Sequence, residues 1–193
     1  MKIALVKYGA GNTSSVLFAL QRLGHTGQVT DDPHLLVSAD KVIFPGVGEA
    51  GAAMAYLRQK GLDRLLPSLR QPVLGICLGM QLMCSYSEES DTPCLGIFDK
   101  RVKRFGPGLK VPQIGWNNIH DLKGELFEGI AENAYMYFVH SYYAVCDDYD
   151  TARTDYGIGY CSAMQKNNFY AVQFHPEKSG AAGQKLLENF LKL

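Results

Sequence analysis

Three short apolar runs in the first half of the chain each end in a turn that leads into a helical pattern. The runs are 3–6 (IALV), 41–44 (KVIF) and 72–76 (PVLGI). Strands without polar alternation are buried on both faces, and strands that alternate with helices form a mostly parallel sheet. We therefore expect an α/β fold in which helices cover both faces of such a sheet.

The helices of this half begin and end at ordinary signals. Asn12 or Thr13 is placed to cap the first helix, whose apolar stripe ends before Gly24, and a second helix is expected over 50–60. A third begins near Leu78.

The second half has the pattern of a mixed sheet. Strand-like runs occur at 135–139, 151–153, 161–165 and 170–174, and the last two flank asparagines that tolerate a tight hairpin. A final helix from Gly180 carries an apolar stripe of Leu186, Leu187, Phe190 and Leu191. The polar and acidic segment 85–91 is expected to be an exposed loop.

Length and charge narrow the class of protein. A chain of 193 residues fits one domain, 1–193, and its formal net charge is zero. A neutral chain has no field of one sign with which to hold nucleic acid or an anionic membrane. The five cysteines are odd in number and form no C-x-x-C pair, so we expect free thiols in a reducing compartment. With no signal peptide or membrane span in the pattern, a cytoplasmic protein is expected.

The sharpest local signal is the segment Gly75-Ile76-Cys77-Leu78-Gly79. A cysteine between two glycines, where a strand meets a helix, has the form of a nucleophile elbow, because the turn leaves no room for neighbouring side chains. A helix N-terminus also favours the thiolate. A cysteine taken at random is more often a small buried core residue, but this position indicates that Cys77 is a nucleophile.

A second signal, Gln173-Phe174-His175-Pro176-Glu177, supplies a base. Pro176 favours an extended His175, and on an extended chain Glu177 projects to the same side, where it can fix the imidazole tautomer. The rival base, His140, has no carboxylate at suitable spacing and is interpreted as structural. Three further histidines lie in turn-like polar contexts and are expected at the surface: His25, His34 and His120.

Acyl transfer also needs backbone donors for the developing oxyanion. The turn Pro45-Gly46-Val47-Gly48 leaves a strand at the sheet edge expected to carry Cys77, so the N–H groups of Val47 and Leu78 are the candidates. Glycines on both sides of Val47 let its peptide plane rotate, which predicts a switch between a carbonyl-inward and an N–H-inward state.

Together these segments resemble class I glutamine amidotransferases, with Cys77, His175 and Glu177 matching that family's triad. The match is closer to the glutaminase subunits of imidazole glycerol phosphate synthases and covers essentially the whole chain. It rests on YGAGN at 8–12, PGVG at 45–48, GICLGMQ at 75–81, GWN at 115–117, FVHSY at 138–142 and QFHPEKSG at 173–180.

The resemblance implies a flavodoxin-like, three-layer fold and a two-part enzyme. It implies hydrolysis of L-glutamine to glutamate and ammonia through a cysteinyl thioester, with ammonia passed to a separate (β/α)8-barrel cyclase in histidine biosynthesis. No metal or organic cofactor is implied. The amino-acid end of glutamine would be held by Gly48, Gln81, Ser141 and Tyr142. The cyclase would be met by a surface around Asn12, Trp116, Tyr137 and Lys178.

Other functions remain open at this point. One is a glutaminase subunit of another synthase, of the pyridoxal phosphate or anthranilate type, although PGVG with GICLGMQ disfavours it. Another is a catalytically silent interaction protein on the same fold. A third is a cysteine peptidase, which would need an open groove for an extended peptide. Trp116, the only tryptophan, could also be an ordinary core residue.

Overall fold

The computed structural model describes residues 1–9 and 13–193. Its helices are α1 (Thr13–Arg22), α2 (Pro33–Ser38), α3 (Ala50–Gln59), α4 (Leu62–Leu65), α5 (Leu78–Met83) and α6 (Gly180–Lys192). Short 3-10 turns are η1 (Leu66–Ser68), η2 (Glu89–Asp91), η3 (Glu125–Phe127) and η4 (Pro176–Lys178).

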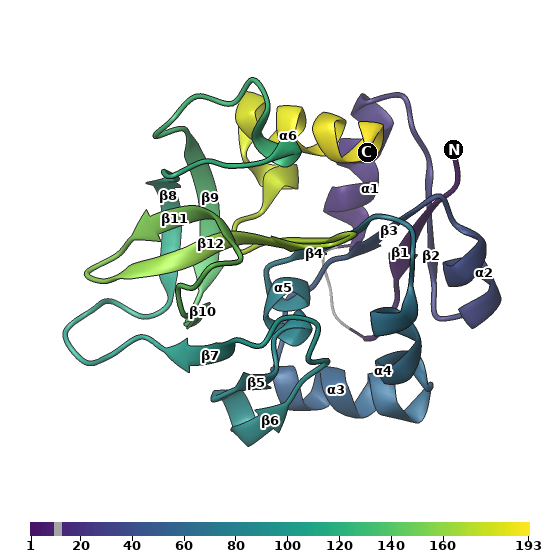
Figure 1. Cartoon of the computed structure of the whole chain (residues 1–193), viewed down its shortest axis with the longest axis horizontal. Helices are drawn as coiled ribbons and strands as arrows, with labels where there is room; N and C mark the ends of the chain where they lie inside the picture. Colours follow the sequence, from purple (N-terminus) through teal and green to yellow (C-terminus); the bar gives the residue numbers. More distant parts are fainter. Residues whose placement is uncertain (10–12) are drawn as a thin grey trace.

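Within the described residues, eleven strands form one mixed sheet (Figure 1). They are β1 (Ile3–Val6), β2 (Gly27–Thr30), β3 (Lys41–Phe44), β4 (Val73–Ile76), β5 (Tyr86–Ser87), β6 (Thr92–Pro93), β7 (Arg101–Arg104), β10 (Tyr142–Ala144), β11 (Asp150–Asp155), β12 (Gly159–Lys166) and β13 (Phe169–Val172). The order is β2-β1-β3-β4-β13-β12-β10-β7-β5-β6, with β11 beside β12. The neighbouring strands β2, β1, β3, β4 and β13 run parallel to one another. Strand β12 is antiparallel to β13, and β10 is antiparallel to β12.

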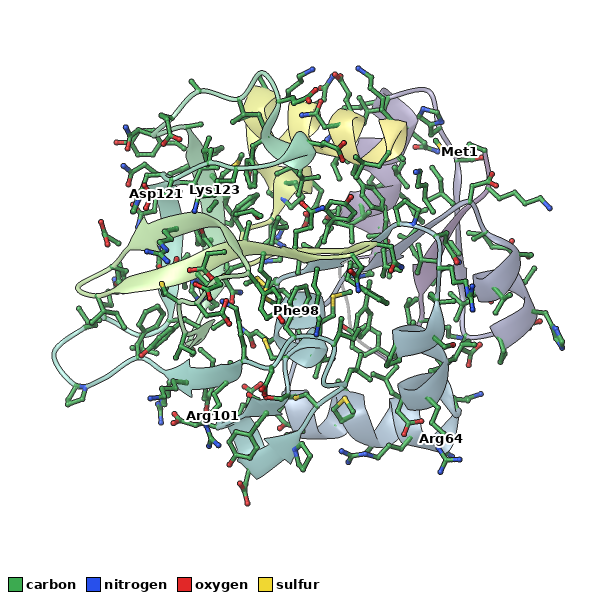
Figure 2. All side chains as sticks on the ribbon, in the orientation of Figure 1. Met1, Arg64, Phe98, Arg101, Asp121 and Lys123 are labelled. Atoms are coloured by element: carbon green, nitrogen blue, oxygen red, sulfur yellow. The ribbon has the colours of Figure 1, made fainter. Side chains whose placement is uncertain are left out.

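Two apolar layers lie on opposite faces of this sheet. Successive side chains of a strand point to opposite faces, so Ile3 and Leu5 join the layer under α1 and α6, whereas Ala4 and Val6 join the layer over α3 and α5. Figure 1 shows these helices above and below the strands. In Figure 2 the ring of Phe98, which is fully buried, lies in the interior. The predicted α/β fold with helices on both faces is confirmed.

Local sequence signals account for most elements. The apolar stripe of α6 is buried as predicted, and each large side chain so buried contributes about 1.5–3 kcal/mol. Gly24 ends the first helical segment with φ +77°, and Asn167 turns the β12–β13 hairpin with φ +55°. Asn12, proposed as a cap, lies outside the described residues.

Two expectations about the second half were wrong. The run at 135–139 does not join the main sheet; it forms β9 (Tyr135–His140), which pairs with β8 (Gln113–Asn118) in a separate two-stranded sheet (Figure 1). The reason is that the inner side chains of β9 pack into the core under α6, where the ring of Phe138 meets that of Phe174 edge-on. The GWN segment at 115–117 forms the middle of β8.

The segment 85–91 is not an exposed loop. It contains β5, which pairs with β6 and β7, and the turn η2. Ser87 is fully buried, and Glu89 accepts a hydrogen bond from the N–H of Ala50 at the start of α3 (2.9 Å). Ser87 can be buried and Glu89 partly buried because backbone donors satisfy them, which an isolated segment does not reveal. None of the described helices has the length and apolar character needed to cross a membrane.

Candidate active site

Cys77 lies in a strained turn between β4 and α5. Its backbone has φ +53° and ψ −108°, unusual for a residue with a side chain. A Cβ on Gly79 would lie 1.8 Å from the carbonyl oxygen of Phe44, and one on Gly75 would lie 2.9 Å from Met83. Glycine is therefore required at position 79, and a side chain at position 75 would force its neighbours to shift, in line with the sequence pattern. The N–H of Cys77 donates to the carbonyl of Val172 in β13 (2.8 Å), and this bond anchors the turn to the sheet.

His175 and Glu177 form a buried pair after β13. His175 Nδ1 and Glu177 Oε1 are 2.8 Å apart, and both side chains are almost completely buried. The chain reaches this geometry differently from our expectation: His175 is extended, but Pro176–Lys178 is the 3-10 turn η4. The turn brings the carboxylate back under the ring.

The imidazole of His175 is held as a cation. Burial lowers its pKa, but the nearby Cys77 sulfur and the hydrogen-bonded Glu177 carboxylate outweigh burial and raise the pKa to about 10. His175 Nε2 is buried and has no partner at standard hydrogen-bond distance in the described part of the chain. A protonated imidazole next to a cysteine can hold a thiolate and later give its proton to a leaving group.

His140 has the surroundings of a structural residue. Its Nδ1 lies 2.8 Å from the carbonyl of Tyr142, and its Nε2 lies 3.2 Å from the hydroxyl of Tyr160. Burial lowers the pKa of His140 to about 4, and the nearby His175 adds to the effect. The ring is therefore neutral at physiological pH, in agreement with the interpretation from sequence. His34 is exposed, and His25 and His120 are partly exposed.

A cavity of about 270 Å³ opens beside the sulfur of Cys77. It collects, from five separate segments, all the residues proposed to hold glutamine and both proposed oxyanion donors. Its lining is Val47, Gly48, Cys77, Leu78, Gln81, Glu89, Pro112, Val139, His140, Ser141 and Tyr142. Its volume is that of a site for a small molecule.

The segment after β3 is in a carbonyl-inward state. The N–H of Leu78 donates to the carbonyl of Gly46 (3.3 Å). Because the peptide between Gly46 and Val47 is trans, the N–H of Val47 points to the opposite side. Both residues proposed as oxyanion donors line the cavity. In this state, however, the Leu78 N–H is occupied by the Gly46 carbonyl, and the Val47 N–H is turned away.

An aromatic patch lies on the outer face of β8 and β9. The register pairs Trp116 with Tyr137 and Ile114 with Val139, and Trp116 is 55% exposed. The rings of Trp116 and Tyr137 are 5.9 Å apart, and Lys178 Nζ lies 6.0 Å from the Tyr137 ring centre. Trp116 is therefore not a core residue. We call Ile114, Trp116, Tyr135, Tyr137, Val139 and Lys178 the outer aromatic face. Asn12, the fourth proposed interface residue, is outside the described residues.

Two polar residues of the site were not predicted from sequence. Glu89 lines the cavity from the segment that we interpreted as a loop, and nothing local pointed to it. Partial burial raises its pKa. Gln173 donates from Nε2 to Cys77 Sγ (3.6 Å); its place two residues before His175 on an extended stretch was a usable signal. In the described ranges, no three His, Cys, Asp or Glu side chains converge as a metal site.

Comparison with known proteins places this geometry in a family. The family model for glutamine amidotransferase class-I matches residues 5–193. Imidazole glycerol phosphate synthase subunit HisH of Bacteroides thetaiotaomicron is 56% identical, and that of Bacteroides fragilis 55% identical, each over all of both chains. HisH of Haemophilus influenzae is 45% identical over all of this chain and 98% of its own.

Solved structures agree on the fold. A protein from Thermoplasma acidophilum, described as part of a GMP synthase, superposes with a TM-score of 0.77 at 20% identity, covering all of this chain and 92% of its own. A structure described as a glutamine amidotransferase gives the same score at 19% identity, covering 98% of this chain and 97% of its own. The chain belongs to the class I glutamine amidotransferase family and, within it, to the HisH subunits of imidazole glycerol phosphate synthases.

Proposed function

We propose that this chain hydrolyses L-glutamine to glutamate and ammonia through a thioester on Cys77, and that it supplies the ammonia to a cyclase subunit in histidine biosynthesis. The observation that carries the proposal is a strained cysteine on a cavity wall, backed by a buried histidine that a carboxylate holds and whose pKa is raised. Residues for both steps of acyl transfer are present there, and membership of the glutamine amidotransferase family indicates glutamine as the substrate.

In the first step the thiolate of Cys77 attacks the side-chain carbonyl carbon of glutamine. The carbon–nitrogen bond then breaks, and His175 gives its Nε2 proton to the departing nitrogen, which leaves as ammonia. In the second step His175 takes a proton from water, the resulting hydroxide attacks the thioester, and the carbon–sulfur bond breaks. Glutamate leaves and the thiolate returns. Glu177 accepts the Nδ1–H of His175 throughout, so that Nε2, the nitrogen that gives and takes the proton, stays on the Cys77 side.

The polar groups of the cavity match the charged end of glutamine. Both N–H donors of Gln81 are used, on the carbonyl of Tyr142 and on Gln173 Oε1 (2.9 Å each), so its own carbonyl oxygen is left to accept. Glu89 adds a carboxylate. These two acceptors suit the α-ammonium group, while backbone N–H groups near Gly48, Ser141 and Tyr142 suit the α-carboxylate.

Activation would require the Gly46–Val47 peptide to rotate. In the observed state the Gly46 carbonyl occupies the Leu78 N–H. A single rotation would release that donor and turn the Val47 N–H inward, so both oxyanion donors would appear together. Loss of one such donor typically costs about 10²–10³ in kcat. We propose that the partner and its ligand favour the rotated state, which prevents wasteful hydrolysis by the isolated chain.

The outer aromatic face is the proposed docking surface for the cyclase, together with Asn12. Aromatic residues flanked by a single cation are typical anchors of protein interfaces. Val139 belongs both to this face and to the cavity wall, so a partner seated there would lie next to the place where ammonia is released. A (β/α)8 barrel is the proposed architecture of the cyclase, and the cytoplasm the proposed location.

The test is to purify the chain with and without candidate cyclase subunits and to measure glutamate release, each with and without the cyclase's ligand. We expect a stable complex and ligand-stimulated release. An electrophilic glutamine analogue should modify Cys77, identified by mass spectrometry of the labelled peptide. Modification of another cysteine, or glutamate release only with a pyridoxal phosphate or anthranilate synthase partner, would contradict the proposal.

A further inference from the structure

Gln173 is a fully buried amide beside the reacting sulfur. It follows β13 directly, and the preceding residue, Val172, accepts the N–H of Cys77 (2.8 Å). The backbone of Gln173 is itself fixed, because its N–H donates to the carbonyl of Ser162 in β12 (2.9 Å). The side chain therefore approaches Cys77 from a rigid strand end, with Nε2 lying 3.6 Å from Sγ.

The other end of the same amide contacts Gln81, a residue of the cavity wall. Gln173 Oε1 accepts from Gln81 Nε2 (2.9 Å), and the second N–H of Gln81 goes to the carbonyl of Tyr142 (2.9 Å). Gln81 is 4% exposed and lines the cavity. The bonds to Cys77 and to Gln81 fix the orientation of the Gln173 amide. If it were flipped, its NH₂ group would face the NH₂ group of Gln81, and its oxygen would face the sulfur of Cys77.

We infer that Gln173 is a further residue of the glutaminase reaction: its amide N–H holds the Cys77 sulfur as a thiolate, and its carbonyl orients Gln81 toward the substrate. The inference rests on the proposed function. It assigns to one buried side chain the link between the nucleophile and the binding pocket.

The physical basis is the change of charge on sulfur during the reaction. A donor hydrogen bond to an ionised acceptor is about twice as strong as one to a neutral acceptor. Gln173 therefore favours the thiolate over the thiol before attack, and again when the carbon–sulfur bond breaks. The carbonyl of Val139, 3.7 Å from Sγ, acts in the opposite sense because it can only accept from the thiol.

Six titratable side chains lie on or near the Cys77 site. They are His175 with its carboxylate Glu177, the buried hydroxyls of Tyr8 and Tyr160, and His140 and Glu89 in the cavity lining. A variant at Gln173 leaves all six in place, so a change in thiol reactivity would report on the amide itself.

The experiment measures the rate of iodoacetamide modification of Cys77 against pH in the full chain, by mass spectrometry of the Cys77 peptide. For Gln173→Met, we expect the midpoint of this profile to rise by about 0.5–1 pH unit. In the complex with the cyclase, kcat should fall about 10- to 100-fold. Gln81→Met should instead chiefly raise KM and move the midpoint less. Gln165→Met, a partly exposed glutamine on β12, should change neither.

A second measurement uses the unmodified residue and does not depend on the stability of a variant. The side-chain amide resonances of Gln173 in an NMR spectrum should shift as Cys77 ionises, and this shift should vanish in Cys77→Ala. The inference would be overturned if the Gln173 amide resonances titrated identically in the wild type and in Cys77→Ala. It would also be overturned if a folded Gln173→Met had the iodoacetamide pH profile and the kcat of the wild type. Failure of the glutamine analogue to label Cys77 would instead overturn the proposed function.

Discussion

Two turns leave neighbouring parallel strands at the same edge of the sheet, but they are built for different tasks. The turn after β4 holds Cys77 rigidly, since glycine Cβ positions there would collide with backbone atoms and the N–H is bonded to β13. The turn after β3 is held to it by the Leu78 to Gly46 hydrogen bond of 3.3 Å, and Val47 is 38% exposed. The nucleophile is thus fixed in place, whereas the proposed oxyanion donors are held in a state in which neither faces the cavity as a donor, and a peptide rotation is the proposed way to present them.

The largest expected effect tests the fixed turn. Cys77→Ala should lower glutamine-dependent activity of the complex by at least about 10³-fold, because triad members act as one unit. Activity with added ammonium salts should persist, since the cyclase reaction does not need the thiol. Cys146→Ala, at an exposed cysteine, is the matched control and should retain activity. Substantial glutamine hydrolysis by Cys77→Ala would place the nucleophile elsewhere.

The movable turn is tested by Val47→Pro, which removes the N–H that would become the second donor. Ligand-stimulated kcat should fall about 10²–10³-fold, while the unfolding temperature stays close to that of Val47→Ala, which keeps the N–H. Iodoacetamide modification of Cys77 needs no oxyanion donor, so its rate should differ little between the two variants. If Val47→Pro were stimulated normally, the turn after β3 would not be the switch.

A smaller effect is expected at the carboxylate that supports the fixed turn. Glu177→Gln should lower kcat about 10- to 100-fold, less than His175→Ala, because Glu177 orients the ring but does not transfer the proton. It should also lower the pKa of His175, which the carboxylate raises, so the imidazole of the variant would lose its proton at lower pH. NMR titration of the His175 ring checks this sign. Equal losses of kcat in two folded variants would point to another carboxylate.

The smallest effect concerns the surface proposed to control the movable turn. Trp116→Ala or Lys178→Ala should weaken cyclase binding about tenfold, as for a single interface anchor. Val37→Ala, also at an exposed apolar residue, should leave affinity unchanged. Titration calorimetry measures both. Unchanged affinity and unchanged stimulation in both face variants would move the docking surface elsewhere.

Much of the fold and the centre of the site could be predicted from the sequence, because the relevant signals are local. The apolar runs of β1, β3 and β4 fix the parallel strands, and the glycines beside Cys77 fix its turn, since chain geometry over a few residues decides both. His175 and Glu177 meet because they are two residues apart. That they are the catalytic residues, and that 1–193 is one domain, remain predictions.

Only the tertiary structure decided which distant segments complete the site. Gln173 reaches Cys77 across ninety-six positions, Glu89 lines the same cavity from a different segment, and β8 and β9 form their own sheet because of what they pack upon. The direction of the Gly46 carbonyl is likewise set by the N–H of Leu78, in another element. Local patterns determine backbone conformation, but side-chain partners and the state of a movable peptide depend on packing between segments that the sequence does not place side by side.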